Sequence, residues 1–181
     1  AGQFTFNIGH TYADGAANYS VTVSVDDVLP QSGSDSFGVS VNNIAPTLSL
    51  GGAGSVNEGS SFTLPISSND PGSDTISQYV IHWGDGNQTT LSAGDLLALG
   101  GNVPHTYADG NQTLNITVDV TDEDGSYTAA GSRSLFVANV APTAPVSGAN
   151  AVDEGSAYTL SVGAVVDPGA DARTSYSIAW G

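Results

Sequence analysis

The sequence predicts an all-β protein made of tandem sandwich modules. Short runs rich in Val, Ile, Thr, Tyr and Leu alternate with clusters of Gly, Asp, Asn and Pro at roughly ten-residue spacing, which is typical of antiparallel sandwiches. No window shows a convincing helical periodicity. The hexapeptide HTYADG occurs at residues 10–15 and again at 105–110, which indicates a domain-sized repeat of about 95 residues.

Other motifs recur with nearly the same spacing and divide the chain of 181 residues into three parts. The recurring pairs are 43–47 with 139–143, 56–60 with 152–156, and 70–74 with 167–171. We therefore expect the C-terminal half of one module at 1–43, a complete module at 44–138, and the N-terminal half of a further module at 139–181.

The first strands of the complete module are expected at 47–50, 61–66 and 78–83. Period-two alternation places Tyr79, Ile81 and Trp83 on one face of the third strand, which we assign to the core. The Asp-Pro-Gly sequence at 70–72 predicts a turn, because proline restricts φ and glycine tolerates positive φ.

The later strands are expected at 105–107, 113–119 and 127–137. The second of these leads into the clearest alternation in the chain, with apolar residues at every other position from Leu114 to Val120. Residues 91–99 are less regular and predict either one short helical turn or a strand with a loop. The counterpart in the first repeat is shorter, so this is the expected site of variation.

Seven strands in a module of this size fit an immunoglobulin-like sandwich that lacks the usual disulfide, because the chain has no cysteine. The motifs at 79–86 (YVIHWGDG), 105–107 (HTY) and 114–124 also resemble the polycystic kidney disease (PKD) domain family. The resemblance covers the complete repeat and both partial ones. It departs from the family at His82, where an acidic or polar residue is more usual, and in the third repeat, which ends before its Gly-Asp-Gly. The resemblance implies an extracellular β-sandwich used as a spacer or adhesive module.

The composition is strongly acidic, with 18 Asp and Glu residues against two basic ones and a formal net charge of -16. Such a surface repels nucleic acid and anionic membranes, whose recognition depends on Lys and Arg. No apolar run is long enough to span a bilayer, so no membrane insertion is expected. Carboxylates without nearby positive charges repel one another, so a folded chain with this many needs either high ionic strength or bound cations to offset the repulsion.

Alternating strand directions place the turns at two poles of the module. Glu58, Asp85 and Asp109 are expected at the downstream pole, and Asp70, Asp74, Asp122 and Asp124 at the upstream pole. Carboxylates from neighbouring modules would then converge at each linker. Ca²⁺ takes six to eight hard oxygen ligands, so we expect structural calcium there, with Mg²⁺ the weaker candidate. The candidate ligands are Asp14, Asp27, Glu58, Asp70, Asp74, Asp85, Asp109, Asp122, Asp124, Glu154, Asp167 and Asp171. The alternative for each aspartate is turn chemistry alone.

No catalytic residues are expected. The sequence contains neither a Gly-x-Ser-x-Gly elbow nor a His-Glu-x-x-His motif. His10 and His105 occupy the same repeat position, which favours a packing or hydrogen-bonding role for the histidines over metal or acid–base chemistry.

The two partial modules are complementary in sequence. Residue 1 placed after residue 181 aligns Trp-Gly-Ala-Gly with Trp83-Gly84-Asp85-Gly86. Neither half would bury a core alone. Covalent continuation of a longer chain, strand complementation between subunits, and an arbitrary boundary in a long array all remain open.

These features predict a non-enzymatic structural segment of an extracellular surface, adhesin or filament protein. Calcium would rigidify it, and its partners would be neighbouring modules or identical subunits. The alternative is a carbohydrate- or protein-binding accessory module of a secreted hydrolase or adhesin.

Overall fold

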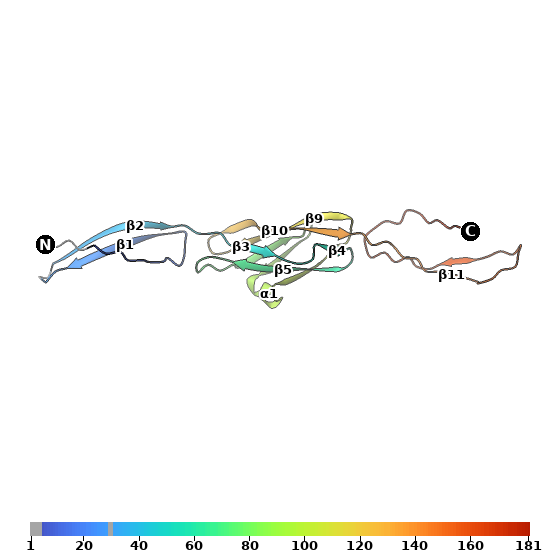
Figure 1. The fold of residues 1–181 in the computed structure, drawn as a ribbon, viewed down its shortest axis with the longest axis horizontal. Coiled ribbons are helices and arrows are strands. Elements are labelled where there is room, and N and C mark those ends of the chain that lie inside the picture. The colour runs from blue at the N-terminus through green and yellow to red at the C-terminus, as the bar shows by residue number, and fades with distance from the viewer. Residues whose placement is uncertain (1–4, 29–30) are drawn as a thin grey trace.

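The computed structural model describes residues 5–28 and 31–181, which form an elongated all-β arrangement with one short helix (Figure 1). Three parts follow one another along the long axis. A hairpin of β1 (Ala17–Asp26) and β2 (Ser32–Val41) lies at one end, and β11 (Val146–Gly148) with β12 (Leu160–Val162) lies at the other. The all-β prediction is confirmed. No helix in the described part of the chain is long and apolar enough to cross a membrane.

Two sheets between these ends form what we call the central sandwich. One sheet has five strands in the order β4-β10-β9-β6-β7, and the other has three in the order β3-β5-β8. Their bounds are β3 (Thr47–Leu50), β4 (Ser55–Asn57), β5 (Ser61–Asn69), β6 (Gln78–His82), β7 (Gln88–Ser92), β8 (Asn102–Thr106), β9 (Gln112–Thr121) and β10 (Ser126–Ala138).

The inward faces of the two sheets share one apolar core. Leu64 of β5 packs in the same cluster as Ile81 of β6, Ile116 of β9 and Leu135 of β10, and all four are fully buried. Trp83 is also fully buried, and its indole N–H donates to the hydroxyl of Thr89 at 2.9 Å. The predicted alternation along 61–66, 78–83 and 114–120 is therefore confirmed.

Residues 91–99, expected to hold either a short helical turn or a strand with a loop, contain the helix α1 (Ala93–Ala98), which follows the strand β7. The helix begins at a capping box in which Ser92 and Asp95 exchange side-chain-to-backbone hydrogen bonds, a pattern that satisfies amide groups at a helix start. The short strand β4 lies where no strand was expected and pairs in parallel with the end of β10.

The N-terminal segment (5–28 and 31–43) and the C-terminal segment (139–181) each hold only part of the strand set of the central sandwich. Apolar residues that correspond to core positions are consequently exposed. Trp180 corresponds to the fully buried Trp83 but is 68% exposed, and Val25 corresponds to the buried Val120 but is 66% exposed.

Candidate metal centres at the two junctions

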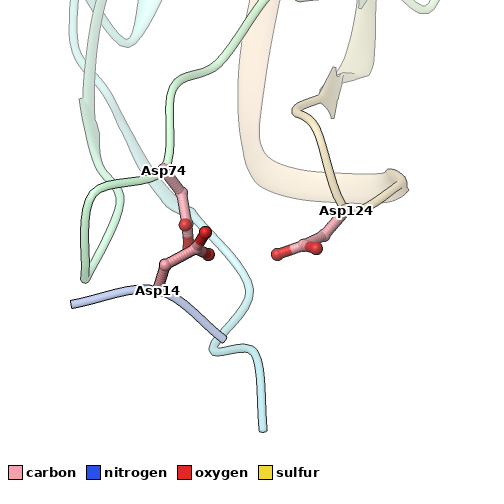
Figure 2. Close-up of side chains that lie close together, drawn as sticks. All are labelled: Asp14, Asp74 and Asp124. Atoms are coloured by element: carbon pink, nitrogen blue, oxygen red, sulfur yellow. The ribbon is translucent and has the colours of Figure 1, made fainter. Parts of the chain in front are cut away.

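Three aspartates from separate loops meet where the N-terminal segment joins the central sandwich. Asp14 comes from the turn before β1, Asp74 from the β5–β6 connection, and Asp124 from the β9–β10 turn. Each offers one carboxylate oxygen, and these oxygens all lie within 4.8 Å of one another. Figure 2 shows Asp124 directing its carboxylate toward Asp14 and Asp74. We call this cluster the upstream junction.

Backbone contacts hold these loops in place. The amide of Ser73 donates to the carbonyl of Ala13 at 2.7 Å and so ties the Asp74 loop to the Asp14 turn. In the β9–β10 turn, Oδ1 of Asp122 accepts the amides of Asp124 at 2.8 Å and Gly125 at 2.9 Å. Such an Asx turn is a common local role for aspartate, but it uses only one of the two oxygens of Asp122.

The remaining oxygens at this junction are short of donors. Oδ2 of Asp122, Oδ1 of Asp74 and both oxygens of Asp70 are buried, and none accepts a hydrogen bond from any described residue. Asp122 itself is only 7% exposed. A buried carboxylate without donors is costly, because it has lost its hydration without compensation.

The electrostatics of the upstream junction reflect this crowding. Burial, followed by the hydrogen bond and charge of Asp14, raises the pKa of Asp74 to about 6. Burial and the charges of Asp122, Glu123 and Asp124 also raise the pKa of Asp70. Arg133, the arginine of the central sandwich, donates instead to the carbonyls of Gly51 and Ala53. The cluster is therefore a site of uncompensated negative charge.

A second cluster lies where the central sandwich joins the C-terminal segment. Glu58, Asp109 and Asp171 each offer one oxygen, again within 4.8 Å of one another. The amide of Ala170 donates to the carbonyl of Ala108 at 2.7 Å, which links the two parts. We call this cluster the downstream junction.

Glu58 is the buried member of the downstream junction, with no exposed surface. Its Oε1 accepts the amide of Val140 at 2.7 Å, whereas its Oε2 is buried and has no partner in the described part of the chain. A Cβ at Gly110 would lie 2.6 Å from Oε2, and one at Gly169 would lie 2.5 Å from Cδ. Glycine at both positions therefore allows the loops to close around this carboxylate.

The two junctions share two of their three carboxylate positions, and they differ in the third, which is Asp124 upstream and Glu58 downstream. Asp14 and Asp109 occupy the same place in HTYADG, and Asp74 and Asp171 the same place in the Asp-Pro-Gly motif. The 2.7 Å amide-to-carbonyl contact also recurs between corresponding residues. Asp167 corresponds to Asp70, and its Oδ1 is likewise buried without a partner. Burial and the charges of Glu58, Asp109 and Asp167 raise the pKa of Asp171.

Six candidate ligands lie outside the two clusters. Asp70 and Asp122 lie beside the upstream one and Asp167 beside the downstream one, and three others lie apart from both. Asp85 was expected to join Glu58 and Asp109, but its Oδ2 lies 2.8 Å from Nε2 of His105, and its carboxylate also accepts two hydrogen bonds from Asn87. Although burial opposes it, these hydrogen bonds hold the pKa of Asp85 below its usual value. Asp85 therefore does not join Glu58 and Asp109, because its oxygens already form hydrogen bonds with His105 and Asn87.

Asp27 and Glu154 are the other two candidate ligands that lie apart from both clusters. Asp27 lies in the β1–β2 turn, where its amide donates to the carbonyl of Gln31 at 3.3 Å, and Glu154 lies in the exposed loop between β11 and β12. In the repeat register they correspond to Asp122 and Glu58. They therefore occupy the far poles of the two terminal segments, where neither cluster of the described chain reaches.

One further polar group at the upstream junction was missed from the sequence. Asn43 lines the same small cleft as Asp14 and Asp74, and its Oδ1 is buried without a described partner. Its Nδ2 donates to the hydroxyl of Tyr127 at 2.5 Å. The signal was available, because Asn43 recurs as Asn139 in the repeated linker motif.

The histidines that were assigned to packing do pack. His105 stacks on Trp83 with ring centroids 4.4 Å apart, and Nε2 of His82 lies 2.9 Å from Oδ2 of Asp119. His10 and His105 also make the same edge-on contact with the tyrosine two residues later, Tyr12 or Tyr107.

The oxygens that converge at both junctions are carboxylates, joined upstream by the amide oxygen of Asn43, and hard divalent cations prefer such ligands. No model of a known protein family and no curated protein matches this sequence.

Proposed function

We propose that this chain is a structural repeat segment of an extracellular surface, adhesin or filament protein, rigidified by calcium at its module junctions. The observation that carries the proposal is that carboxylates converge at two successive junctions, with two equivalent positions in common and with buried oxygens that lack donors at each. A turn needs no such convergence, because Asx hydrogen bonds are satisfied within a single loop.

The repeat register indicates how a complete junction would be composed. The downstream junction shows what the preceding module contributes, a buried Glu58 and Asp109. The upstream junction shows what the following module contributes, Asp74 and Asp124 with Asp70 and Asp122 beside them. The six carboxylates together supply enough oxygen ligands for calcium, and their charge would oppose close approach of the modules without a cation.

When residues on both sides of a linker bind the same cation, the bound cation restricts the relative motion of the two modules. An ion held by Asp14 and Asp74 restricts rotation about the linker, as does one held by Asp109 and Asp171. Extracellular calcium-binding modules commonly work at sub-millimolar to millimolar affinity, which matches a surface location. Two packed sheets without a disulfide support the PKD-like, immunoglobulin-like assignment of the module.

A binding module is the less favoured alternative. Carbohydrate platforms need exposed aromatic faces, whereas Tyr79, Trp83 and Tyr107 of the central sandwich are buried. The described sandwich also presents most of its acidic groups in the turns at its poles, where the neighbouring segments attach.

The test is thermal unfolding of the chain in calcium, in magnesium and in chelator. We expect calcium at a hundredfold excess over its Kd to raise the midpoint by roughly 10 °C, because binding to the native state alone adds about 2.7 kcal/mol. Magnesium should raise it less. A midpoint that is the same in calcium and in chelator would contradict the calcium proposal.

Single substitutions should localise the effect. Asp74→Asn is expected to raise the midpoint in chelator, since it relieves repulsion, and to reduce the calcium-dependent rise. Asp153→Asn is a matched control, because Asp153 is exposed and lies outside both clusters. Equal calcium responses of the two variants would contradict the assignment of the upstream junction.

A further inference from the structure

The carboxylates at the upstream pole of the central sandwich differ in depth. Asp14, Asp74 and Asp124, which we call the outer triad, are exposed or half-buried. Asp70 and Asp122 lie deeper, because both oxygens of Asp70 and Oδ2 of Asp122 are buried, and Asp122 is only 7% exposed. Apart from Oδ1 of Asp74, the buried carboxylate oxygens without donors at this pole therefore belong to residues outside the triad.

Contacts between two loops bring Asp70 and Asp122 together. The amide of Thr75 donates to both carboxylate oxygens of Glu123, at 2.9 and 3.1 Å. This contact holds the β5–β6 connection, which begins at Asp70, against the β9–β10 turn, which contains Asp122. Burial raises the pKa of Asp70, and among its charged neighbours Asp122 contributes most to the rise.

Asn43, which lies between β2 and β3, adds a neutral oxygen to these carboxylates. Its Nδ2 donates to the hydroxyl of Tyr127 at 2.5 Å, whereas its Oδ1 is buried and has no partner in the described part of the chain. Burial, followed by the charge of Asp122, raises the pKa of Tyr127, so the phenol and this carboxylate are neighbours. We call Asn43, Asp70 and Asp122 the inner set.

The fold supplies no positive charge to this pole. Among the described residues, the ion pairs are those of His82 with Asp119 and of His105 with Asp85, and they include no member of the inner set or the outer triad. A single divalent cation held by the outer triad would leave the oxygens of the inner set buried and without donors. Such a state is costly for a carboxylate.

We propose that the inner set binds a second cation, a buried Ca²⁺ distinct from the one held by the outer triad. The donors are both oxygens of Asp70, Oδ2 of Asp122 and Oδ1 of Asn43. Calcium accepts such a mixture of carboxylate and amide oxygens and completes its coordination with water or backbone carbonyls. This inference rests on the proposed calcium function and specifies that the upstream junction takes two ions.

The two cations have different roles, because their ligands come from different parts of the chain. The inner set belongs to the central sandwich and to the linker residue Asn43, so the inner ion orders the loops of one module. The outer ion needs Asp14 of the N-terminal segment and therefore joins that segment to the sandwich.

The test counts the calcium ions bound to the 181-residue chain. Equilibrium dialysis is carried out at a calcium concentration that just saturates the unmodified chain. Asp122→Asn removes a charge of the inner set, and its amide oxygen can still accept the amides of Asp124 and Gly125 in the turn. Asp14→Asn removes a ligand of the outer triad. Each single variant should bind one ion fewer, and the double variant two fewer. Asp153→Asn is the matched control and should lose none.

The double variant distinguishes failure of this inference from failure of the calcium function. If all the ligands surround one ion, the double variant loses one ion, as each single variant does. That result would overturn the second site and leave the calcium function standing. An unmodified chain that binds no calcium would overturn both.

Tyr127→Phe tests the inner set without changing its charge. The phenol hydroxyl orients Asn43 by a hydrogen bond, and loss of a partner that orients a ligand typically weakens metal binding about 10- to 100-fold. Calorimetric titration should show one class of calcium sites weakened by this amount, with the other classes unchanged. Tyr158→Phe is the matched control, because Tyr158 lies between β11 and β12, far along the chain from this pole. Equal weakening of every class by Tyr127→Phe would contradict the inner site.

Discussion

At the scale of single residues, the most informative groups are carboxylates whose surroundings do not compensate their charge. Asp85 and Asp74 both follow glycine-rich turns, yet their pKa values shift in opposite directions. Hydrogen bonds from His105 and Asn87 lower that of Asp85, whereas burial and Asp14 raise that of Asp74. The difference separates an aspartate satisfied within the fold from one that is suited to a cation.

This difference predicts an unusual pH dependence in chelator. The pKa of Asp74 is about 6 in the folded chain against 3.8 in the unfolded chain, so the native state binds more protons between these values. The unfolding free energy should therefore rise as the pH falls from about 7 toward 5, instead of declining.

Chemical denaturation at pH 7 and pH 5 in chelator measures this effect. Asp74→Asn should flatten the trend, and saturating calcium should reverse it, because a bound cation favours the ionised carboxylate. Lower stability at pH 5 than at pH 7 in chelator would contradict the prediction.

At the scale of elements, corresponding strands with similar sequences have different energetic roles. Ile81 of β6 is fully buried, whereas Ile178 occupies the same repeat position and is 52% exposed. Intrinsic strand preference is therefore the same in both places, and the packing that Ile81 gains from the neighbouring strands and from the facing sheet distinguishes them. Most of the stability of such strands comes from packed faces.

A matched pair of substitutions should expose the difference. Ile81→Ala is expected to lower the unfolding free energy of the central sandwich by about 2–5 kcal/mol, the usual range for truncating a buried isoleucine. Ile178→Ala should change it by less than about 0.5 kcal/mol. Urea unfolding followed by Trp83 fluorescence, in a Trp180→Phe background, measures both. Equal losses would mean that the C-terminal segment unfolds together with the sandwich.

At the scale of the whole molecule, the chain is a row of parts joined by short linkers (Figure 1). Each linker is flanked by one carboxylate cluster and two hydrogen bonds: the amide-to-carbonyl contact, and the bond of Asn43 to Tyr127 upstream or of Val140 to Glu58 downstream. A hydrogen bond contributes only about 1 kcal/mol, so two of them offer little resistance to the mutual repulsion of the carboxylates. Alignment should therefore depend on the cation.

Small-angle scattering of dilute, monomeric chain can measure this alignment. We expect a larger maximum dimension and a more rod-like profile in calcium than in chelator. Glu58→Gln should reduce the response by weakening the downstream junction, whereas Asp153→Asn should not. Identical profiles in calcium and chelator would show that the linkers are held by protein contacts alone.

Most strands of the central sandwich were predictable, because period-two alternation is a local signal of a strand with one buried face. The strand β4 was not, and the sequence left open whether 91–99 would form a helical turn or a strand. β4 has only three residues and forms by pairing with β10, far away in sequence. The helix depends on the capping box of Ser92 and Asp95, which the irregular pattern at 91–99 obscured.

The candidate site was likewise predictable only in part. The sequence by itself determined the repeat, the inward faces, and the placement of carboxylates in turns at the two poles, because these follow from local patterns and strand alternation. Only the tertiary structure decided that Asp14, Asp74 and Asp124 meet, that Glu58 is buried, and that His105 satisfies Asp85. Convergence of oxygens from separate loops depends on how sheets and linkers pack in three dimensions, and no local pattern encodes those distances.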